Sequence, residues 1–248
     1  MLKTSIIIRT KNEEKWIGEN LKRLANQTYK NFEIIIVDSG STDKTLDIVN
    51  KFNNLLNIKV FKIKPKEFSY PFALNYGIKQ SLAEKYLVML SGHSLPISKT
   101  WLEDGLKNFT DEKIMGVYGF VWALPDGSIC EKLIFNEYLC RIKNIFRKRI
   151  IIEKGAMGVM GFTNAIIRKD LWGKRNFNEN YGLGGEDGEW ANYWFQKGYK
   201  AIRDIKFSVY HSHGLGYKQL KRQWEHWWSL DKPQPFKPLD FRKKKISW

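Results

Sequence analysis

Two short runs of the sequence decide the fold: Ser-Ile-Ile-Ile-Arg at residues 5–9 and Glu-Ile-Ile-Ile-Val-Asp at residues 33–38. Both are apolar and rich in β-branched residues without alternation, which is typical of strands covered on both faces. Between them, apolar residues recur at helical spacing over residues 12–27. We expect Glu13 and Glu14 in the first turn of that helix, where the helix dipole favours carboxylates. The three segments predict a parallel strand–helix–strand unit.

The same alternation continues downstream. We predict a helix at 43–52, a strand at 58–63, a helix at 71–83 that opens with proline, and a strand at 86–90. Alternating strands and helices are typical of an α/β fold with a Rossmann-like, doubly wound, mostly parallel sheet flanked by helices and joined by right-handed crossovers.

The pattern is looser after residue 90. The segments that we predict there are, in chain order, a helix at 99–109, a strand at 115–122, a basic amphipathic helix at 131–149, a glycine-bearing loop at 155–161, a strand at 163–168, a helix at 186–197, a strand at 201–205 and a helix at 217–229. The tail at 231–248 is rich in proline and basic residues, and we expect an arm there. We therefore expect a main domain at 1–215, with halves at 1–95 and 96–215, and a basic, aromatic extension at 216–248.

The composition is that of a folded globule, because 43% of the 248 residues are hydrophobic and 15% are aromatic. No apolar run is long enough to span a membrane, and the apolar stretch at 2–10 is too short for a secretory signal, so we expect a cytoplasmic protein. Cys130 and Cys140 match neither a zinc site nor a disulfide framework, and we expect both to be reduced.

The chain is strongly basic, with 42 Lys and Arg against 26 Asp and Glu and a formal net charge of +16. Such a charge attracts polyanions, and a nucleic acid, an anionic membrane face or a diphosphate substrate would each fit it. The alternative is a lysine-rich surface that only keeps the protein soluble. A nucleic-acid-binding module would need aromatic residues on exposed strands or a recognition helix, and the sequence indicates neither.

Polar residues follow three of the predicted strands, at the sheet edge where doubly wound folds bind their ligands. They are Arg9 to Glu13 after the first strand, Asp38 to Asp43 after the second, and Ser91 to Ser94 after the fourth. Helix capping by Asn12, Ser41 or Thr42 and turn formation at Gly40 would explain some of these residues without any ligand.

Taken together, these segments resemble a known family. Ser-Ile-Ile-Ile-Arg-Thr-Lys-Asn-Glu, the later Gln27-Thr-Tyr and Ile-Ile-Val-Asp38-Ser-Gly-Ser-Thr-Asp43 are similar to the opening of the family 2 inverting glycosyltransferases, which include bacterial polysaccharide and O-antigen sugar transferases. The resemblance covers about 4–215. It implies the GT-A fold and the transfer of a sugar from a nucleotide-sugar donor to an acceptor hydroxyl.

The resemblance also implies donor-binding residues. Arg9, Thr10, Lys11 and Glu13 would contact the base and ribose together with Asp38. The Asp38 carboxylate would accept the imide N–H of a pyrimidine, which favours UDP or dTDP as the carrier.

Further positions of the donor site match the family pattern or depart from it. Asn75 matches the family's asparagine beside the diphosphate, and Ser91 and His93 follow the fourth strand. Ser39 and Leu74 depart from the pattern, because the family often has an acidic residue and an arginine there.

The family's metal motif is altered. A GT-A enzyme normally ends its fourth strand in Asp-x-Asp, which holds Mg²⁺ or Mn²⁺ against the diphosphate, whereas this chain has Ser91-Gly92-His93. His211 in His211-Ser-His213 would supply a second imidazole, and imidazole favours softer ions such as Mn²⁺. The alternative is that His93 hydrogen-bonds a phosphate and basic residues neutralise the leaving group without a metal.

The segment Gly182-Leu-Gly-Gly-Glu186-Asp187-Gly-Glu-Trp190 resembles the family's Glu-Asp motif. The motif assigns Asp187 as the base that removes the acceptor proton, and Glu186 as the residue that orients the helix or acceptor. Asn164 and Trp190 would contact the acceptor. A carboxylate at a helix start is also a common cap, and a catalytically silent homologue is the other alternative.

Aromatic residues lie beside cations in two places, the helix at 131–149 and the C-terminal region. The C-terminal set comprises Trp224, Trp227, Trp228, Phe236 and the cluster at 242–245. This pairing is typical of a peripheral contact with an anionic membrane face, and a lipid-linked acceptor would explain it. The alternative is that the aromatics pack in the core under a solvated face.

Overall fold

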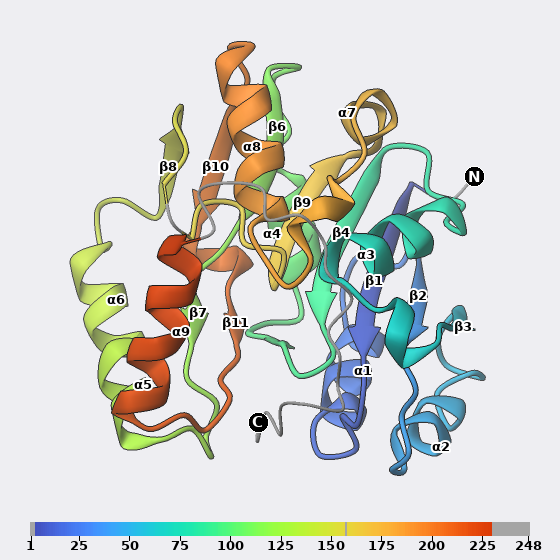
Figure 1. Cartoon of the computed structure of the whole chain (residues 1–248). Helices are drawn as coiled ribbons and strands as arrows, with labels where there is room; N and C mark the ends of the chain where they lie inside the picture. Colours follow the sequence, from blue (N-terminus) through green and yellow to red (C-terminus); the bar gives the residue numbers. More distant parts are fainter. Residues whose placement is uncertain (1–2, 157, 230–248) are drawn as a thin grey trace.

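The computed structural model describes residues 3–156 and 158–229. Within those residues, eight strands form one twisted sheet in the order β3-β2-β1-β4-β9-β6-β10-β8, and three short strands form a second sheet in the order β5-β11-β7 (Figure 1). Most pairs in the large sheet are parallel, but β9 runs antiparallel to β4 and β6, and β8 runs antiparallel to β10. The predicted α/β class with a mostly parallel sheet is confirmed.

The first half of the large sheet follows the expected alternation. Its elements are β1 (Thr4–Thr10), α1 (Ile17–Ala25), β2 (Phe32–Asp38), α2 (Thr45–Asn50), β3 (Ile58–Lys62), α3 (Tyr70–Lys79) and β4 (Tyr86–Ser91). The register aligns Thr10 with Asp38 and Arg9 with Ser91, so the carboxyl ends of β1, β2 and β4 meet at one edge. The polar residues after these strands are thereby brought together.

The rest of the chain extends the sheet and covers it. Its elements are β5 (Leu95–Pro96), α4 (Trp101–Leu106), β6 (Ile114–Tyr118), β7 (Val121–Trp122), α5 (Ile129–Ile134), α6 (Glu137–Lys143), β8 (Arg149–Ile152), β9 (Asn164–Arg168), α7 (Lys169–Lys174), α8 (Glu186–Gln196), β10 (Lys200–Asp204), β11 (Val209–Tyr210) and α9 (Tyr217–Ser229). The helix α9 occupies the predicted range, and the predicted arm lies outside the described residues.

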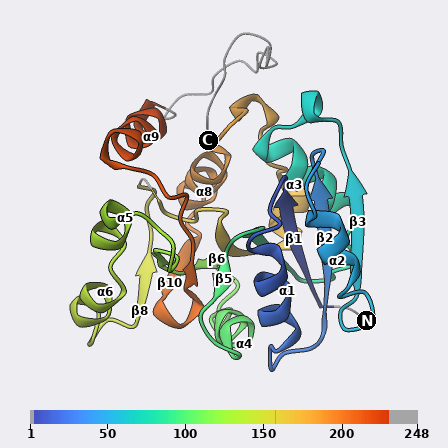
Figure 2. The same ribbon diagram turned by 90° about the horizontal axis from the view of Figure 1, so that it is seen from below.

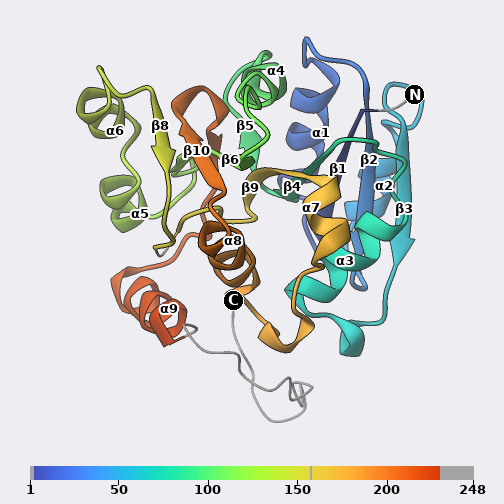
Figure 3. The same ribbon diagram turned by 90° about the horizontal axis from the view of Figure 1, so that it is seen from above.

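Helices cover both faces of the large sheet. One face packs against α1, α2 and α4 through a core that includes Ile6, Leu21 and Trp101. The other packs against α3, α7 and α8 through Ile7 and Trp190, among others. The views from below and above show these two layers, with α1 and α3 on opposite sides of the strands (Figures 2 and 3). Burial on both faces explains why the first strands carry no polar alternation.

The helix predicted at 12–27 is shorter than expected. It begins at Ile17, because Asn12 adopts a left-handed φ of 54° and the residues after it bond to the loop that follows β2. The prediction that Glu13 and Glu14 occupy the first helical turn is therefore wrong. Both carboxylates instead bond to other loops.

The strand predicted at 115–122 divides into β6 and β7, which belong to different sheets. Gly119 lies at the break. A Cβ atom built on it would lie 1.7 Å from the carbonyl oxygen of Phe207, so only glycine permits this close approach of two backbones. Separating the two strands gives β7 to the small sheet, where it pairs with β11.

The prediction of a single helix at 131–149 is also wrong. The chain forms α5, breaks at Phe135, forms α6 and then enters β8. The side chain of Asn136 caps α6 by accepting a hydrogen bond from the N–H of Leu139 at 3.0 Å, which starts a new helix. Arg149, the last residue of the predicted helix, pairs with Asp204 and begins the edge strand β8.

Among the described residues, no helix is both long and apolar enough to cross a membrane.

Candidate active site

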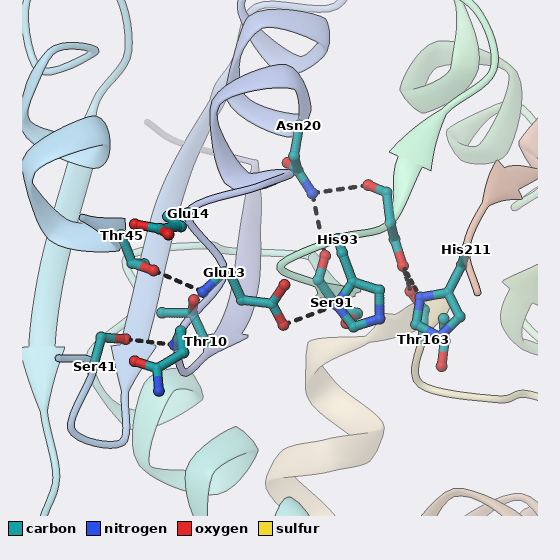
Figure 4. Close-up of polar contacts among 12 residues, drawn as sticks. Thr10, Glu13, Glu14, Asn20, Ser41, Thr45, Ser91, His93, Thr163 and His211 are labelled. Carbon is teal, nitrogen blue, oxygen red and sulfur yellow. Dashed lines mark hydrogen bonds and ion pairs between the residues drawn. The ribbon is translucent and has the colours of Figure 1, made fainter. Parts of the chain in front are cut away.

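The loops that follow β1 and β2 are locked together by hydrogen bonds. The backbone N–H of Asn12 donates to Ser41 Oγ at 2.9 Å, and the N–H of Thr42 donates to Asn12 Oδ1 at 2.8 Å. The N–H of Glu13 donates to Thr45 Oγ1 at 2.7 Å, as Figure 4 shows. Asn12 and Ser41, which the sequence suggested as helix caps, thus join the two loops to each other. The result is a preorganised rim at the carboxyl ends of β1 and β2.

Asp38 lies under this rim. Its carboxylate accepts hydrogen bonds from the N–H groups of Gly40 at 3.1 Å and Ser41 at 3.0 Å, and from the Ser41 hydroxyl. The residue is 1% exposed. In this structure Asp38 holds the turn after β2, and its contact with a base stays a prediction.

Arg9 connects the donor edge with the start of α8. Its Nη1 lies 3.8 Å from Glu186 Oε1, and its guanidinium carbon lies 4.4 Å from the centre of the Tyr70 ring. Tyr70 in turn donates its backbone N–H to the carbonyl of Gly182 at 2.8 Å. Residues that are far apart in the sequence therefore meet at one point. Tyr70 was missed at the sequence level, because an aromatic residue at a helix start carries no signal of a cation above its ring.

A run of glycines places the two carboxyl groups at the start of α8. Gly182, Gly184 and Gly185 all adopt positive φ angles, of 57°, 134° and 94°, which other residues reach only with strain. The helix then begins at Glu186. Asp187 Oδ2 accepts a hydrogen bond from the N–H of Phe162 at 3.3 Å. Glu186 is 2% exposed, whereas Asp187 is partly exposed and open to a ligand.

The protein environment favours the protonated forms of this pair. Burial, and then the neighbouring charge of Asp187, raise the pKa of Glu186 to about 8, although Arg9 opposes the shift. Removal of water also raises the pKa of Asp187, against the hydrogen bonds from the N–H groups of Gly188 and Phe162. With its pKa raised to about 8, Glu186 holds a proton near neutral pH, and burial favours proton uptake by Asp187 as well. Its raised pKa makes it a stronger base than an ordinary aspartate.

Three histidines form a cluster at the carboxyl end of β4. Ligand atoms of His93, His211 and His213 all lie within 4.8 Å of one another. The His93 and His211 rings stack with centroids 4.3 Å apart, and His213 packs edge-on against both. The chain thus joins the turn after β4 with the segment after β11, as predicted for His93 and His211.

The cluster has the features of a cation site. His93 Nδ1 bonds to Glu13 Oε1 at 2.8 Å, and His211 Nδ1 bonds to Ser94 Oγ at 3.1 Å (Figure 4). Carboxylate or hydroxyl partners on one ring nitrogen are typical of metal-binding histidines. His93 Nε2 is buried and has no hydrogen-bond partner. Burial lowers the pKa of His211 well below its ordinary value, which keeps the imidazole neutral and able to ligate. The residues present therefore fit a divalent cation.

The turn that carries His93 is held from α1. The Asn20 amide donates to the carbonyls of Ser91 at 3.1 Å and Ser94 at 2.8 Å. Asn20 is fully buried and was missed at the sequence level, because a polar residue on the buried stripe of a helix does not reveal its partner. Ser91 Oγ lies 3.5 Å from His93 Nδ1.

Other predicted site residues lie in the interior. The Asn75 amide donates to the carbonyl of Phe177 at 2.8 Å and to Glu179, and Asn75 Oδ1 accepts from the Trp172 indole. Trp190 is fully buried in the core under α8, and Asn164 donates to the carbonyl of Phe207. In this structure these three side chains support the fold around the site. Their contacts with donor or acceptor stay predictions.

Several buried polar atoms at the site lack a hydrogen-bond partner. Among the described residues they include Arg9 Nη1, Thr10 Oγ1, His93 Nε2 and Glu186 Oε2. Buried polar groups are normally paired, so these four atoms are available for hydrogen bonds to a ligand. Lys11 is exposed at the rim of the same edge.

Comparison with known proteins agrees with this geometry. A model described as glycosyl transferase family 2 matches residues 5–174. The chain is 33% identical over 144 residues to a dolichyl N-acetyl-α-D-glucosaminyl phosphate 3-β-D-2,3-diacetamido-2,3-dideoxy-β-D-glucuronosyltransferase of Methanococcus voltae, a match that covers 53% of this chain and 44% of the relative.

Two solved structures share the fold. The mannosyltransferase PcManGT of Pyrobaculum calidifontis, in complex with GDP-Man and Mn²⁺, has a TM-score of 0.66 and 19% identity, covering 88% of this chain and 59% of that one. Staphylococcus aureus TarS in complex with UDP-GlcNAc has a TM-score of 0.62 and 23% identity, covering 86% and 59%. The chain thus spans less than half of the curated relative and about three fifths of each solved chain.

Proposed function

The chain belongs to glycosyl transferase family 2 and has the GT-A fold of its structural neighbours, and on that premise we propose that it is an inverting glycosyltransferase. It transfers one hexosyl or deoxyhexosyl unit from a nucleoside-diphosphate sugar, UDP- or dTDP-linked, to the hydroxyl of a saccharide acceptor. The observation that carries the proposal is the carboxyl pair at the start of α8, in which the buried Glu186 lies 3.8 Å from Arg9 and Asp187 is partly exposed.

Asp187 is the general base of this proposal. An inverting transfer needs one carboxylate that removes the acceptor proton while the acceptor oxygen attacks the anomeric carbon. Asp187 is partly exposed and has a raised pKa, which suits that role. Glu186 stays protonated, keeps a second negative charge away from the base and presents an O–H that can orient the acceptor.

The donor would lie across the carboxyl ends of β1, β2 and β4. The rim from Arg9 to Glu13 and the turn held by Asp38 would surround the base and ribose. A pyrimidine is proposed because Asp38 occupies the position that reads the imide N–H in the family. The GDP-Man complex of PcManGT is a reason to test this choice, because the same fold carries a purine donor there.

His93, His211 and His213 would hold a divalent cation. When bound, such a cation would neutralise negative charge on the diphosphate as it departs. Three imidazoles favour Mn²⁺ over Mg²⁺, which prefers oxygen ligands. Glu13 and Ser94 orient the rings of His93 and His211 through the hydrogen bonds already described.

The acceptor is proposed to be a saccharide or a lipid-linked saccharide of surface polysaccharide or glycolipid assembly. The name of the Methanococcus voltae relative includes a dolichyl-linked sugar phosphate, which supports a lipid-linked acceptor. The high positive charge favours binding of the enzyme to the anionic cytoplasmic face of a membrane.

Thermal shift with UDP, dTDP, GDP and CMP tests the donor assignment. We expect UDP or dTDP to raise the unfolding midpoint in the presence of Mn²⁺, and nucleotide-sugar screening to give an inverted glycoside. Asp38→Asn should weaken UDP binding, whereas Asp47→Asn, an exposed aspartate on α2, should not. Equal stabilisation by all four nucleotides would exclude base recognition by Asp38.

A further inference from the structure

The segment at 129–149 exposes large apolar side chains on both of its helices. Phe146 is 96% exposed, and Ile129, Leu133, Tyr138 and Ile142 are between 68% and 79% exposed. We call the exposed side chains of residues 129–149 the α5–α6 surface. Apolar groups gathered in this way normally mark an interaction site, because a monomer rarely leaves such a patch in water.

The α5–α6 surface is also positively charged. Residues 129–149 contain six Lys and Arg and two Glu. Glu131 is buried and accepts hydrogen bonds from backbone N–H groups, while Glu137 pairs with Arg141 and accepts a hydrogen bond from the Tyr210 hydroxyl. Both acidic groups are thus engaged within the protein. Exposed cations such as Arg147 and Lys148 determine the field outside.

Apolar residues and cations alternate along the segment. On α6, Arg141 and Lys143 flank Ile142, and after the helix Phe146 precedes Arg147. A protein interface normally removes charged residues from its apolar centre. At a lipid surface the same mixture is favourable, because apolar side chains enter the acyl boundary while long basic side chains reach the phosphates.

The α5–α6 surface is tied to the reaction site. Glu131 Oε1 accepts the N–H of His213 at 2.9 Å, and Ser128 Oγ donates to the carbonyl of Leu215 at 2.6 Å. The start of α5 therefore holds the segment that carries His211 and His213. In all three ribbon views α5 and α6 lie at the opposite end of the molecule from α2 and β3 (Figures 1, 2 and 3).

A groove of about 590 Å³ lies between α1 and α5. Its lining includes Trp16 from the start of α1, Lys132 from α5, and Tyr210, which precedes the histidine segment. Leu95, the residue after the His211 partner Ser94, also lines it. The groove therefore borders α5, and two of its lining residues, Leu95 and Tyr210, are next in sequence to Ser94 and His211.

We infer that the α5–α6 surface binds the surface of an anionic phospholipid bilayer. Docking there brings the groove and the histidine cluster to the level of the head groups, where a lipid-linked saccharide would present its sugar. The inference rests on the proposed function only for the identity of that acceptor. Binding to lipid requires no substrate and is measured without one.

The test is sedimentation of the full chain with vesicles. We expect binding to phosphatidylglycerol-containing vesicles, little binding to pure phosphatidylcholine, and a decline as salt is raised. Arg147→Gln plus Lys148→Gln should weaken binding by about 25-fold, since each cation near the surface contributes roughly a fivefold factor. Ile142→Ser plus Phe146→Ser should weaken it by about tenfold or more at every salt concentration, because apolar insertion is not screened.

Matched variants at the other end of the molecule are the controls. Leu55→Ser plus Leu82→Ser removes two apolar residues of similar exposure, and Lys51→Gln plus Lys66→Gln removes two exposed cations. Both should bind as the wild type does, and unfolding midpoints verify that every variant is folded. Three results would each overturn the inference: no binding of the wild type to anionic vesicles, equal binding of the α5–α6 variants, or a dimer in sedimentation equilibrium that the same substitutions dissociate.

Discussion

The two ends of the central sheet differ in how much apolar surface they leave in solvent. At the donor end, β1 and β2 lie between α3 and α1, and Ile7 and Ile35 are fully buried. At the other end, α5 and α6 leave Leu133 and Phe146 largely exposed. The difference teaches that fold stability and a rigid donor site come from the first region. The second region retains apolar surface for a partner.

The carboxyl pair that we propose as catalytic lies between the two regions and gives the largest expected effect. Asp187→Asn should lower turnover by roughly 10²- to 10⁴-fold, the usual consequence of losing a general base, while leaving UDP affinity nearly unchanged. Steady-state kinetics and calorimetry measure the two quantities. Asp170→Asn, a surface aspartate paired with Arg168, is the control that should keep turnover. Full activity of Asp187→Asn would move the base to Glu186.

Two substitutions that remove the same number of carbon atoms, one in each region, compare the regions directly. Ile35→Ala opens a cavity in the core and should lower the free energy of unfolding by about 2–5 kcal/mol. Leu133→Ala, at 68% exposure, should change it by only about 0.5 kcal/mol. Urea denaturation measures both. Equal losses would mean that Leu133 is covered in solution, for example by a second copy of the chain.

Glu186 should reduce stability at high pH. Its pKa is raised from 4.5 to about 8, so below pH 4.5 the folded and unfolded forms both carry the proton and no penalty exists. Between these values the unfolded chain releases its proton more readily, and stability falls as pH rises. Glu186→Gln removes the penalty and should be more stable than the wild type at pH 8 by at most about 4 kcal/mol, since each unit of raised pKa corresponds to about 1.4 kcal/mol.

Thermal unfolding of Glu186→Gln and wild type across pH 4 to pH 9 measures this difference. Glu179→Gln is the matched carboxyl control outside the pair. A difference that stays constant with pH would show that the Glu186 carboxyl ionises normally in the folded protein.

The smallest expected effect concerns the partner of His93. Glu13→Gln should weaken Mn²⁺ binding by about 10- to 100-fold, because the carboxylate orients the ring and increases its basicity. Calorimetry with MnCl₂ measures it, with His211→Ala as the variant that removes a ligand and Glu19→Gln on α1 as the control. Unaltered Mn²⁺ affinity in His211→Ala would exclude the cluster as the cation site.

Much of the donor end was predictable because its signals are local. The strands at 5–9 and 33–38 are apolar throughout, and the structure extends each by only one or two residues. The second half was less predictable. The antiparallel insertion of β9, the division at Gly119 and the break at Phe135 depend on contacts with residues distant in the sequence.

The site divides in the same way. The motifs named Arg9, Glu186, Asp187, His93 and His211, and the structure brings them to one edge of the sheet. Glu13 was named as a donor contact, but its bond to His93 could not be foreseen, because the expected helical turn placed the carboxylate elsewhere. Asn20, Tyr70 and Ser94 had no detectable signal, since only their tertiary neighbours give them a role.

The sequence alone determined the alternation of buried strands and helices and the family, because hydrophobic periodicity and motifs depend on neighbouring residues. Only the tertiary structure decided that both carboxyls of the α8 pair have raised pKa values. The Arg9 charge and the N–H of Phe162 come from other elements of the fold. Glu186 and Asp187 lose their contact with water only once the chain has folded.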